Sequence, residues 1–303
     1  MSVDAVAAVL AESPSTTVAI VGPTASGKSA LALELAARVS GEIVSADSVQ
    51  VYRGFDIGSG KPTAEELAQA PHHLVDVCDP LDAIDAAQFV ARARAAIADV
   101  RARGRTPIVC GGTFLWVKAL FWGLAEAAPA NEAHRAQYRE VADRDGAAAL
   151  HDRLRSVDPA IAERLHPNDF VRVSRALEVF ESTGKRLSDA QREHGFAEPW
   201  GSPRLFAVRH APEVLTERIR ARADAWLQHG WIDEVRALDA AGYGAARAMT
   251  SVGYREVLAH VRGELGRDEL LERVVRSTRV FARRQRTWLG HADVTWLDQR
   301  SSA

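Results

Sequence analysis

Residues 22–29 read Gly22-Pro23-Thr24-Ala25-Ser26-Gly27-Lys28-Ser29. This stretch matches the phosphate-binding loop pattern G-x-x-x-x-G-K-[ST] at every fixed position. Residues 17–21 (TVAIV) predict a short buried strand before it, and residues 30–39 predict a helix with an apolar stripe after it. A strand, a glycine-rich loop and a helix in this order predict an α/β fold that carries an anion-binding loop.

Each residue type in the loop has a physical role. Glycines let the backbone curl, so that successive N–H groups point at one anion. Lys28 adds a mobile positive charge, the helix N-terminus adds its dipole, and Ser29 is a candidate ligand for Mg2+. We expect the phosphate to be bound by Gly22, Pro23, Thr24, Ala25, Ser26, Gly27, Lys28 and Ser29. The pattern does not say which phosphate the loop holds.

Strands and helices alternate through the first third of the chain. The pattern predicts strands at residues 41–45, 74–77 and 106–110, and helices at residues 89–103 and from Phe114 onward. This alternation predicts a P-loop-type parallel sheet flanked by helices. His72 and His73 are adjacent, so they cannot easily chelate one ion, and we interpret them as turn or packing residues.

The middle of the chain has a different pattern, with helical periodicity and no convincing strand. Its helices are predicted at residues 133–142, 147–156, 159–165 and 170–181. Strand character returns at 204–208, and helices follow at 213–228, 231–241, 254–262 and 267–289, before a short last strand at 294–297. We therefore expect a core made of residues 1–122 and 200–303, and a helical insertion domain at 123–199.

Composition narrows the class of protein. The chain has 303 residues, of which 47% are hydrophobic, and this is enough for a sizeable core. The net charge of −2 gives no global basic signal, so a nucleic-acid partner requires local basic patches. Cys78 and Cys110 form neither a C-x-x-C nor a Cys/His pattern, which argues against a disulfide framework and a zinc site. Without a signal peptide or a membrane-length apolar run, we expect a cytoplasmic monomer that makes no membrane contact.

Two polar residues follow the predicted strands at the edge where the phosphate loop lies. Asp47 follows the strand at 41–45, and Thr113 follows the strand at 106–110. Because ligands of open α/β sheets bind beyond the carboxyl ends of the strands, we expect both near the phosphate. A carboxylate there can ligate Mg2+ or accept a proton from a nucleophile. The alternatives are that Asp47 is a helix cap and that Gly111-Gly112-Thr113 is only a tight turn.

One expected acid is missing. ATP hydrolases usually carry an Asp at the end of a later hydrophobic strand, where it helps to hold magnesium. The best candidate strand here ends Val109-Cys110-Gly111, without an acid. The sequence therefore favours a phosphate loop that acts on something other than a triphosphate.

The predicted helix at 267–289 carries many arginines. They recur largely three or four residues apart, so many of them share one helix face, and aromatic residues lie among them. Such a stripe suits a nucleic-acid backbone, and we expect Arg283 and Arg284 to contact it. The alternative is a solvated face balanced by Glu269 and Glu272. Arg218 and Arg222 lie four apart on another helix, from which they could reach the phosphate.

Several segments together resemble the tRNA dimethylallyltransferase (isopentenyl transferase) family, in the family's order and over most of the chain. Ser59-Gly60 stands where the family usually has Thr-Ala, and Val171 stands where it usually has Gln; neither departure touches the proposed chemistry. The matching segments are the phosphate loop, Asp47-Ser48-Val49-Gln50-Val51-Tyr52, Asp56-Ile57-Gly58 with Lys61-Pro62, Pro71-His72-His73-Leu74, Gly111-Gly112-Thr113, His166-Pro167-Asn168-Asp169, Arg175-Ala176-Leu177-Glu178-Val179 and Val252-Gly253-Tyr254.

The resemblance implies a reaction and a set of roles. Members transfer a dimethylallyl group from dimethylallyl diphosphate to N6 of an adenosine beside the tRNA anticodon. By resemblance Asp47 is the general base, Thr113 polarises the departing diphosphate, Arg222 binds it, and Mg2+ is the cofactor. The implied partner is the anticodon stem-loop of tRNA, gripped by the insertion. The implied tRNA contacts are Asp47, Ser48, Val49, Gln50, Thr113, Arg135, Val171, Arg172, Val173, Ser174 and Arg175.

Three other functions remain open at this point. An adenylate isopentenyltransferase would use free AMP, ADP or ATP, but it needs neither the helical insertion nor the arginine stripe. A small-molecule kinase would bind ATP in the phosphate loop and consume it. A non-catalytic RNA-binding protein would leave the loop unused, which the intact Lys28, Ser29, Asp47 and Thr113 argue against.

Overall fold

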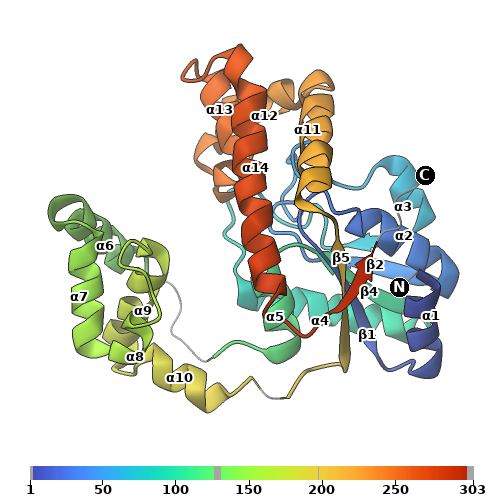
Figure 1. The fold of residues 1–303 in the computed structure, drawn as a ribbon, viewed down its shortest axis with the longest axis horizontal. Coiled ribbons are helices and arrows are strands. Elements are labelled where there is room, and N and C mark those ends of the chain that lie inside the picture. The colour runs from blue at the N-terminus through green and yellow to red at the C-terminus, as the bar shows by residue number, and fades with distance from the viewer. Residues whose placement is uncertain (1–2, 126–130, 197, 299–303) are drawn as a thin grey trace. The chain divides into compact units, whose positions relative to one another are not determined.

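The computed structural model describes residues 3–125, 131–196 and 198–298, and it contains a six-stranded parallel sheet (Figure 1). The strand order is β3-β2-β4-β1-β5-β6, and every pair is parallel. The strands are β1 (Thr17–Val21), β2 (Gly41–Ser45), β3 (His72–His73), β4 (Thr106–Gly111), β5 (Pro203–Arg209) and β6 (Thr295–Asp298). The predicted parallel α/β sheet is confirmed.

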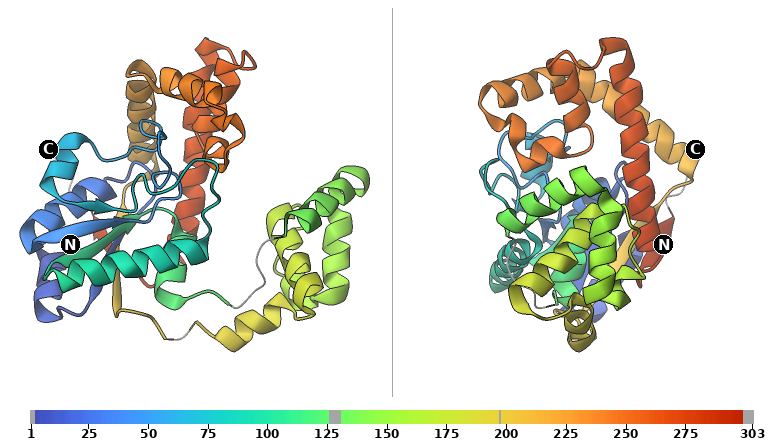
Figure 2. Two further views of the ribbon diagram at one scale, coloured as in Figure 1. Left: turned by 180° about the vertical axis from the view of Figure 1, so that it is seen from behind. Right: turned by 90° about the vertical axis from the view of Figure 1, so that its left-hand side faces the viewer.

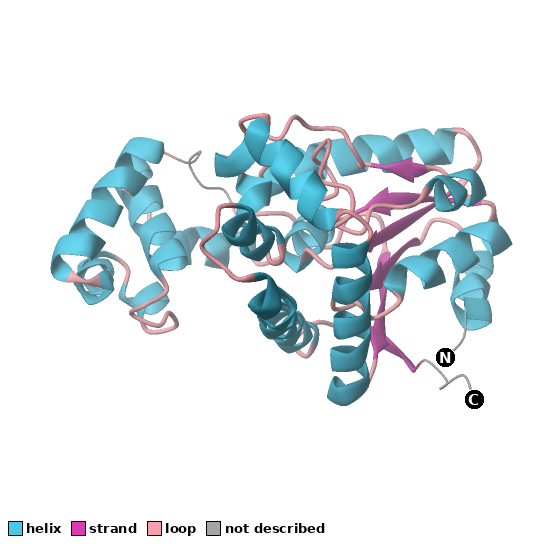
Figure 3. Cartoon of the chain, turned by 90° about the horizontal axis from the view of Figure 1, so that it is seen from above, coloured by secondary structure: helices cyan, strands magenta, loops and turns pink. Residues whose placement is uncertain are grey.

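Helices cover both faces of the sheet (Figure 3). On one face, α1 and α2 pack on Val18, Ile20 and Ile108. Because side chains alternate along a strand, Ala19 and Val109 point to the opposite face. The helices of this unit are α1 (Val3–Glu12), α2 (Lys28–Val39), α3 (Ala64–Gln69), α4 (Ala86–Ala102), α5 (Phe114–Trp122), α11 (Pro212–Gln228), α12 (Trp231–Ala240), α13 (Tyr254–Val261) and α14 (Arg267–Leu289), with 3-10 turns at Tyr243–Ala245 and Arg247–Thr250.

The strand register brings the predicted site segments to one edge of the sheet. Val21, the last residue of β1, pairs with Gly111, the last residue of β4. On the other side of β4, Ser45 at the end of β2 pairs with Cys110. The phosphate loop, the segment after Ser45 and the Gly111-Gly112-Thr113 turn therefore all begin at the same carboxyl edge.

The third strand was predicted in the wrong place. The sequence indicated residues 74–77, but β3 consists of His72–His73, which pair with Ile43 and Val44. Leu74 has φ +64° and Asp76 has φ +58°, so the backbone leaves the extended conformation directly after His73. The two histidines are thus strand residues: His73 Nε2 bonds to the buried Glu42 at 2.7 Å, and His72 Nδ1 donates to the Ala70 C=O at 2.8 Å.

The chain divides into two compact units. One consists of Met1–Phe121 and Trp200–Ala303, and the other is Trp122–Pro199. The expected boundaries, residues 123 and 199, lie within one residue of these. The second unit is helical (Figure 2), with α6 (Glu132–Asp145), α7 (Ala147–Val157), α8 (Pro159–Ala162), α9 (Phe170–Thr183) and α10 (Leu187–His194), the last of which was not predicted.

The helical unit has its own core and its own caps. Tyr138, Leu154 and Leu177 are buried at its centre. Asp158 is fully buried, and its carboxylate accepts the N–H of Ile161 at 3.2 Å and that of Ser188 at 2.9 Å. One acid therefore caps α8 and anchors the start of α10.

The helices are too short or too polar to span a membrane. Across residues 3–125, 131–196 and 198–298, none has both the length and the apolar character needed to cross a bilayer.

Candidate active site

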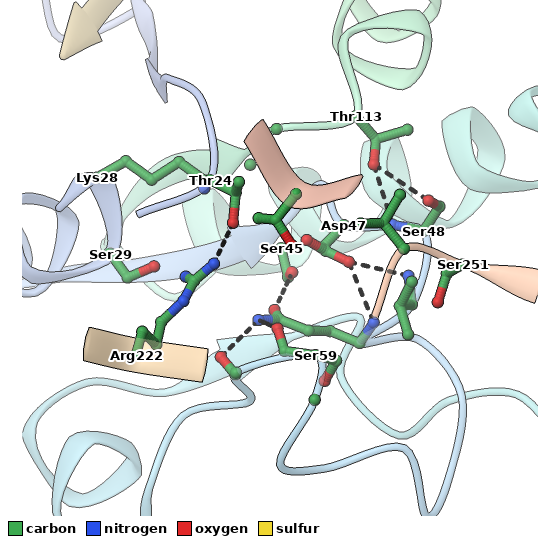
Figure 4. Close-up of a pocket in the computed structure, with 18 of the residues that line it drawn as sticks. Thr24, Lys28, Ser29, Ser45, Asp47, Ser48, Ser59, Thr113, Arg222 and Ser251 are labelled. Atoms are coloured by element: carbon green, nitrogen blue, oxygen red, sulfur yellow. Dashed lines mark hydrogen bonds between the residues drawn. The ribbon is translucent and has the colours of Figure 1, made fainter. Parts of the chain in front are cut away.

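A cavity of about 360 Å3 lies at the carboxyl edge of the sheet (Figure 4). Lys28, Asp47, Thr113 and Arg222, which come from four separate parts of the chain, all line it. The sequence predicted that all four would lie near the phosphate, and the structure brings them together.

Two side chains from the second half of the chain donate hydrogen bonds to carbonyl groups of the phosphate loop. Ala25 has φ +63° and Gly27 has φ +86°, which gives the loop its tight curl. Arg218 Nε donates to the C=O of Ala25 at 2.8 Å, and His210 Nε2 donates to the C=O of Ser26 at 2.8 Å. These two hydrogen bonds tie the backbone of the loop to residues of the second half of the chain.

Two ionisable residues of the loop region have perturbed acidity. Burial lowers the pKa of Lys28, and the neighbouring Cys110 and Asp47 oppose this shift. Cys110 stands where ATP hydrolases carry an acid, and burial raises the pKa of its thiol to about 11. The Ser29 hydroxyl also lines the cavity. The cavity therefore holds Lys28 in a poorly hydrated place, where a negative ligand would favour its charged form.

Arg222 reaches the loop from α11. Its guanidinium donates to the Thr24 hydroxyl and lies over the Trp226 ring at 4.5 Å from the ring centroid. Burial lowers the pKa of Arg222 to about 10, and Asp47 opposes this shift. The cation is therefore oriented by one hydrogen bond and one aromatic face, and it remains charged at neutral pH.

Asp47 both shapes a turn and faces the cavity. Its Oδ1 accepts the N–H of Val49 at 2.9 Å and that of Gln50 at 3.3 Å. Within the described residues, Oδ2 makes no hydrogen bond (Figure 4). No helix begins after Asp47, so it is not a helix cap: one oxygen closes a turn, and the other is left for a ligand.

Thr113 does not cap its own helix with its side chain. The Ser48 N–H donates to Thr113 Oγ1 at 3.1 Å, and the Thr113 hydroxyl donates to Ser48 Oγ at 3.3 Å. The Thr113 N–H in turn donates to the C=O of Ala46 at 3.2 Å. A Cβ on Gly111 would lie 2.2 Å from that same carbonyl oxygen, so only glycine fits this crossing of the two segments.

Gln50 ties the Asp47 turn to the next loop. Its Nε2 donates to the C=O of Gly60 at 2.8 Å and to that of Ser59 at 3.3 Å, while its Oε1 accepts the Ser45 hydroxyl at 2.9 Å. Ser59 and Gly60 both line the cavity. Ser59-Gly60 is the departure from the family's usual Thr-Ala. The sequence analysis expected it to lie away from the chemistry, whereas the structure places it in the cavity wall.

Gln285 is a site residue that the sequence did not single out. Its side chain from α14 is 5% exposed, and it bonds both the phosphate loop and the Gly112 carbonyl. The signal was present, since Gln285 is a polar residue in the otherwise apolar buried stripe of that helix. Trp226, Trp231 and Phe281 also line the cavity and form its apolar wall.

The arginines of α14 do not form the single-sided stripe that was predicted. Arg273, Arg276 and Arg284 line a groove of about 620 Å3 beside α13, whereas Arg276, Arg279, Arg283 and Arg286 line a hollow of about 290 Å3 beside α11. Glu272 pairs with Arg220 of α11 instead of balancing its neighbours. Within the described part of the chain these six arginines form no ion pair, which leaves their charge available to a partner.

The predicted RNA contacts of the helical unit differ in solvent exposure and in their ion pairs. Arg172 and Val171 are exposed, but Val173 and Ser174 are buried. Glu178 is fully buried, and it pairs with Arg175 at 2.7 Å and with Arg135 at 3.7 Å. Although burial opposes ionisation, the N–H of Asn131 and the Arg175 guanidinium hold the pKa of Glu178 below its usual value. Arg135 and Arg175 therefore neutralise a buried acid of their own unit.

Comparison with known proteins identifies the family of this chain. A model of the IPP transferase family matches residues 50–292. A tRNA dimethylallyltransferase of Sorangium cellulosum is 57% identical over 284 residues, which cover 94% of this chain and 90% of the relative. One from Anaeromyxobacter dehalogenans is 50% identical over 281 residues and covers 92% of each chain.

Solved structures give the same family. The tRNA isopentenylpyrophosphate transferase of Bacillus halodurans superposes with a TM-score of 0.69 at 36% identity, covering 94% of this chain and 90% of that one. A eukaryotic dimethylallyltransferase solved acting on tRNA has a TM-score of 0.76 at 28% identity, covering 93% of this chain and 73% of that one. The resemblance seen in the sequence is confirmed, and the chain belongs to the IPP transferase family.

Proposed function

We propose that the protein transfers a dimethylallyl group from dimethylallyl diphosphate to N6 of the adenosine on the 3′ side of a tRNA anticodon. The products are N6-isopentenyladenosine and diphosphate. The observation that carries the proposal is the convergence of Lys28, Asp47, Thr113 and Arg222 on one cavity. The names of the relatives, tRNA dimethylallyltransferases and a dimethylallyltransferase acting on tRNA, support the same substrates.

The cavity offers a place for each half of the donor. The loop amides, Lys28 and Arg222 present positive charge to the diphosphate. Trp226, Trp231 and Phe281 present apolar surface to the five-carbon group. When the C–O bond to the diphosphate breaks, negative charge builds on the leaving oxygen, and these preorganised donors stabilise it. The Thr113 hydroxyl is the donor proposed for the bridging oxygen, and its proton would turn from Ser48 Oγ to that oxygen.

The acceptor must lose a proton as the new N–C bond forms. Asp47 uses Oδ1 to hold the backbone of Val49 and Gln50, so its position is fixed. Its other oxygen has no partner within the described residues and takes the N6 proton. N6 is a weak nucleophile in a stacked loop, so the base must be extruded into the cavity to reach Asp47.

Mg2+ is the proposed cofactor. No cluster of three or more His, Cys, Asp or Glu in the described residues could hold a metal by itself. Mg2+ suits a different donor set, in which one or two protein oxygens act with substrate phosphate oxygens and water. The Ser29 hydroxyl, which lines the cavity, fits that set. When bound, the ion would neutralise charge on the diphosphate.

The RNA is proposed to bind through local basic surface. The arginines of α14 without an ion pair, with Arg283 and Arg284 foremost, contact phosphates. Ser48, Val49 and Gln50 lie beside Asp47 and contact the base or its neighbours. The helical unit grips the anticodon stem-loop through Arg135 and the exposed Val171 and Arg172. The protein is proposed to act as a cytoplasmic monomer.

One experiment tests the function directly. Purified protein is incubated with Mg2+, dimethylallyl diphosphate, ATP, an unmodified anticodon stem-loop and an equal amount of AMP, and mass spectrometry follows both acceptors and the ATP. We expect one C5H8 unit on the adenosine of the RNA and none on AMP. Modification of AMP alone would contradict the proposed acceptor. Consumption of ATP in place of the diphosphate, with no prenylated product, would contradict the reaction itself.

A further inference from the structure

Gln285 lies within the buried stripe of α14, between Ala282 and Leu289. An amide at this depth loses free energy unless its hydrogen bonds are made. Both ends of this amide are used: Oε1 accepts the N–H of Thr24 at 2.8 Å, and Nε2 donates to the C=O of Gly112 at 2.8 Å. One side chain of the C-terminal helix therefore joins the phosphate loop to the turn that carries Thr113.

The two bonded segments carry groups that act on opposite sides of the proposed leaving group. The Thr24 hydroxyl accepts a hydrogen bond from Arg222. Gly112 directly precedes Thr113, whose hydroxyl is bonded to Ser48. Because one planar amide holds both backbones, it fixes the spacing between the Arg222 side and the Thr113 side of the cavity.

The packing around Gly112 leaves this link little freedom. A Cβ on Gly112 would lie 2.6 Å from Gln285 Nε2 and 3.3 Å from the C=O of Gly22. The loop, the turn and α14 are therefore in close contact at one point. About one turn further along α14, Trp288 stacks on Phe114, at 4.8 Å between centroids, so the start of α5 is held by the same helix.

We infer that Gln285 is a positioning residue for the departing diphosphate. It binds the Thr24 N–H, so that this amide orients the loop instead of binding the ligand. Its effect runs through Thr24 and Gly112, and its removal should loosen the spacing between the leaving-group donors. The inference rests on the proposed function, since it assumes a diphosphate in the cavity.

The test compares Gln285→Met with Thr287→Ala. Methionine keeps the length of the side chain and removes both hydrogen bonds, whereas Thr287 is an exposed residue of the same helix. Isothermal titration gives the Kd for inorganic pyrophosphate with Mg2+ and, separately, the Kd for the anticodon stem-loop. Steady-state assays give kcat. Gly112→Ala breaks the same link from its other end, alone and combined with Gln285→Met.

We expect Gln285→Met to weaken pyrophosphate binding about tenfold and to lower kcat by about tenfold to a hundredfold, as for loss of buried hydrogen bonds. The RNA Kd should change less than about twofold, because the arginines of α14 stay in place. Thr287→Ala should behave as wild type, and Gly112→Ala should add little to Gln285→Met, since both break one link.

Other results would point elsewhere. If the wild type binds pyrophosphate and Gln285→Met binds it equally well with unchanged kcat, the inference is overturned and the proposed function stands. If Gln285→Met loses RNA binding to the same degree, its role is general stability, and the inference is again overturned. If the wild type binds no pyrophosphate, the proposed diphosphate site is wrong, and the inference falls with it.

Discussion

Asp47 Oδ1 accepts the backbone N–H of Val49 at 2.9 Å, so the proposed base also builds the turn on which it stands. Asp47→Asn can keep this bond through its amide oxygen but cannot take a proton. We expect a loss of about 10²–10⁴ in kcat, the usual contribution of a positioned general base. Single-turnover prenylation of the stem-loop measures it, with RNA affinity unchanged.

Asp47→Ala is the matched comparison for that variant. It removes the base and the turn together, so we expect it to lower the thermal midpoint as well as the rate, whereas Asp47→Asn should keep the midpoint. Undiminished turnover in Asp47→Asn would remove this carboxylate from the proton transfer.

Arg222 should contribute mainly to the leaving-group step. Arg222→Gln removes a cation that is held by the Thr24 hydroxyl and the Trp226 ring. We expect a loss of about 10²–10³ in kcat, or about 3–4 kcal/mol, by analogy with removal of one oxyanion donor. Arg220→Gln is the control on the same helix, because Arg220 is exposed and pairs with Glu272. Equal losses in both variants would refute a specific role for Arg222.

The arginines of α14 should govern the salt dependence of RNA binding. Arg283→Gln with Arg284→Gln should weaken binding and reduce the slope of log Kd against log salt by roughly 0.7–0.9 for each phosphate that is no longer neutralised. Arg236→Gln with Arg262→Gln removes the same charge from arginines that already pair with acids. An identical slope of log Kd against log salt in the two double variants would show that neither Arg283 nor Arg284 contacts RNA.

Glu42 should make stability depend on acid pH. The Arg103 guanidinium holds the pKa of this buried carboxyl below its usual 4.5, with help from His73 against the cost of burial. Because the folded pKa lies below the unfolded one, the unfolded chain binds more protons in that window. The stabilisation is present above about pH 4.5 and is lost as the pH falls through the folded pKa.

Glu42→Gln tests that linkage. We expect urea unfolding at pH 7 to show about 1–3 kcal/mol less stability than wild type, and the difference to shrink at acid pH. Glu34→Gln, which breaks an exposed pair with Arg38, should cost at most about 0.5 kcal/mol at either pH. A difference for Glu42→Gln that is constant with pH would mean that its charge plays no part.

Local sequence patterns predicted most of the secondary structure and the α/β fold of the protein. The phosphate loop, the buried strands and the starts of the helices at residues 159 and 170 depend on residues close in sequence, so their signals are visible in the chain itself. The position of β3 was missed because Leu74 takes a positive φ that an apolar run does not reveal. Periodicity also placed the α14 arginines on one face, whereas the packing of α11 and α13 divides them between two hollows.

The interactions that were missed join residues far apart in the chain. Gln285 reaches Thr24 across most of the sequence, and no spacing rule connects them. Arg135 and Arg175 were expected only as RNA contacts, because the sequence does not reveal that Glu178 is buried between them. Pairing of this kind follows from the fold and becomes visible only in three dimensions.

The Trp200 N–H donates to the C=O of Phe121 at 2.6 Å, so the chain re-enters the core beside the point where it left. The helical unit is thus an insertion between two neighbouring residues, and the sheet does not need it to close. Lengthening, trimming or exchanging that unit leaves the strand register untouched. With the RNA gripped by the helical unit, as proposed, substrate RNA choice and prenyl chemistry can evolve as separate properties of one chain.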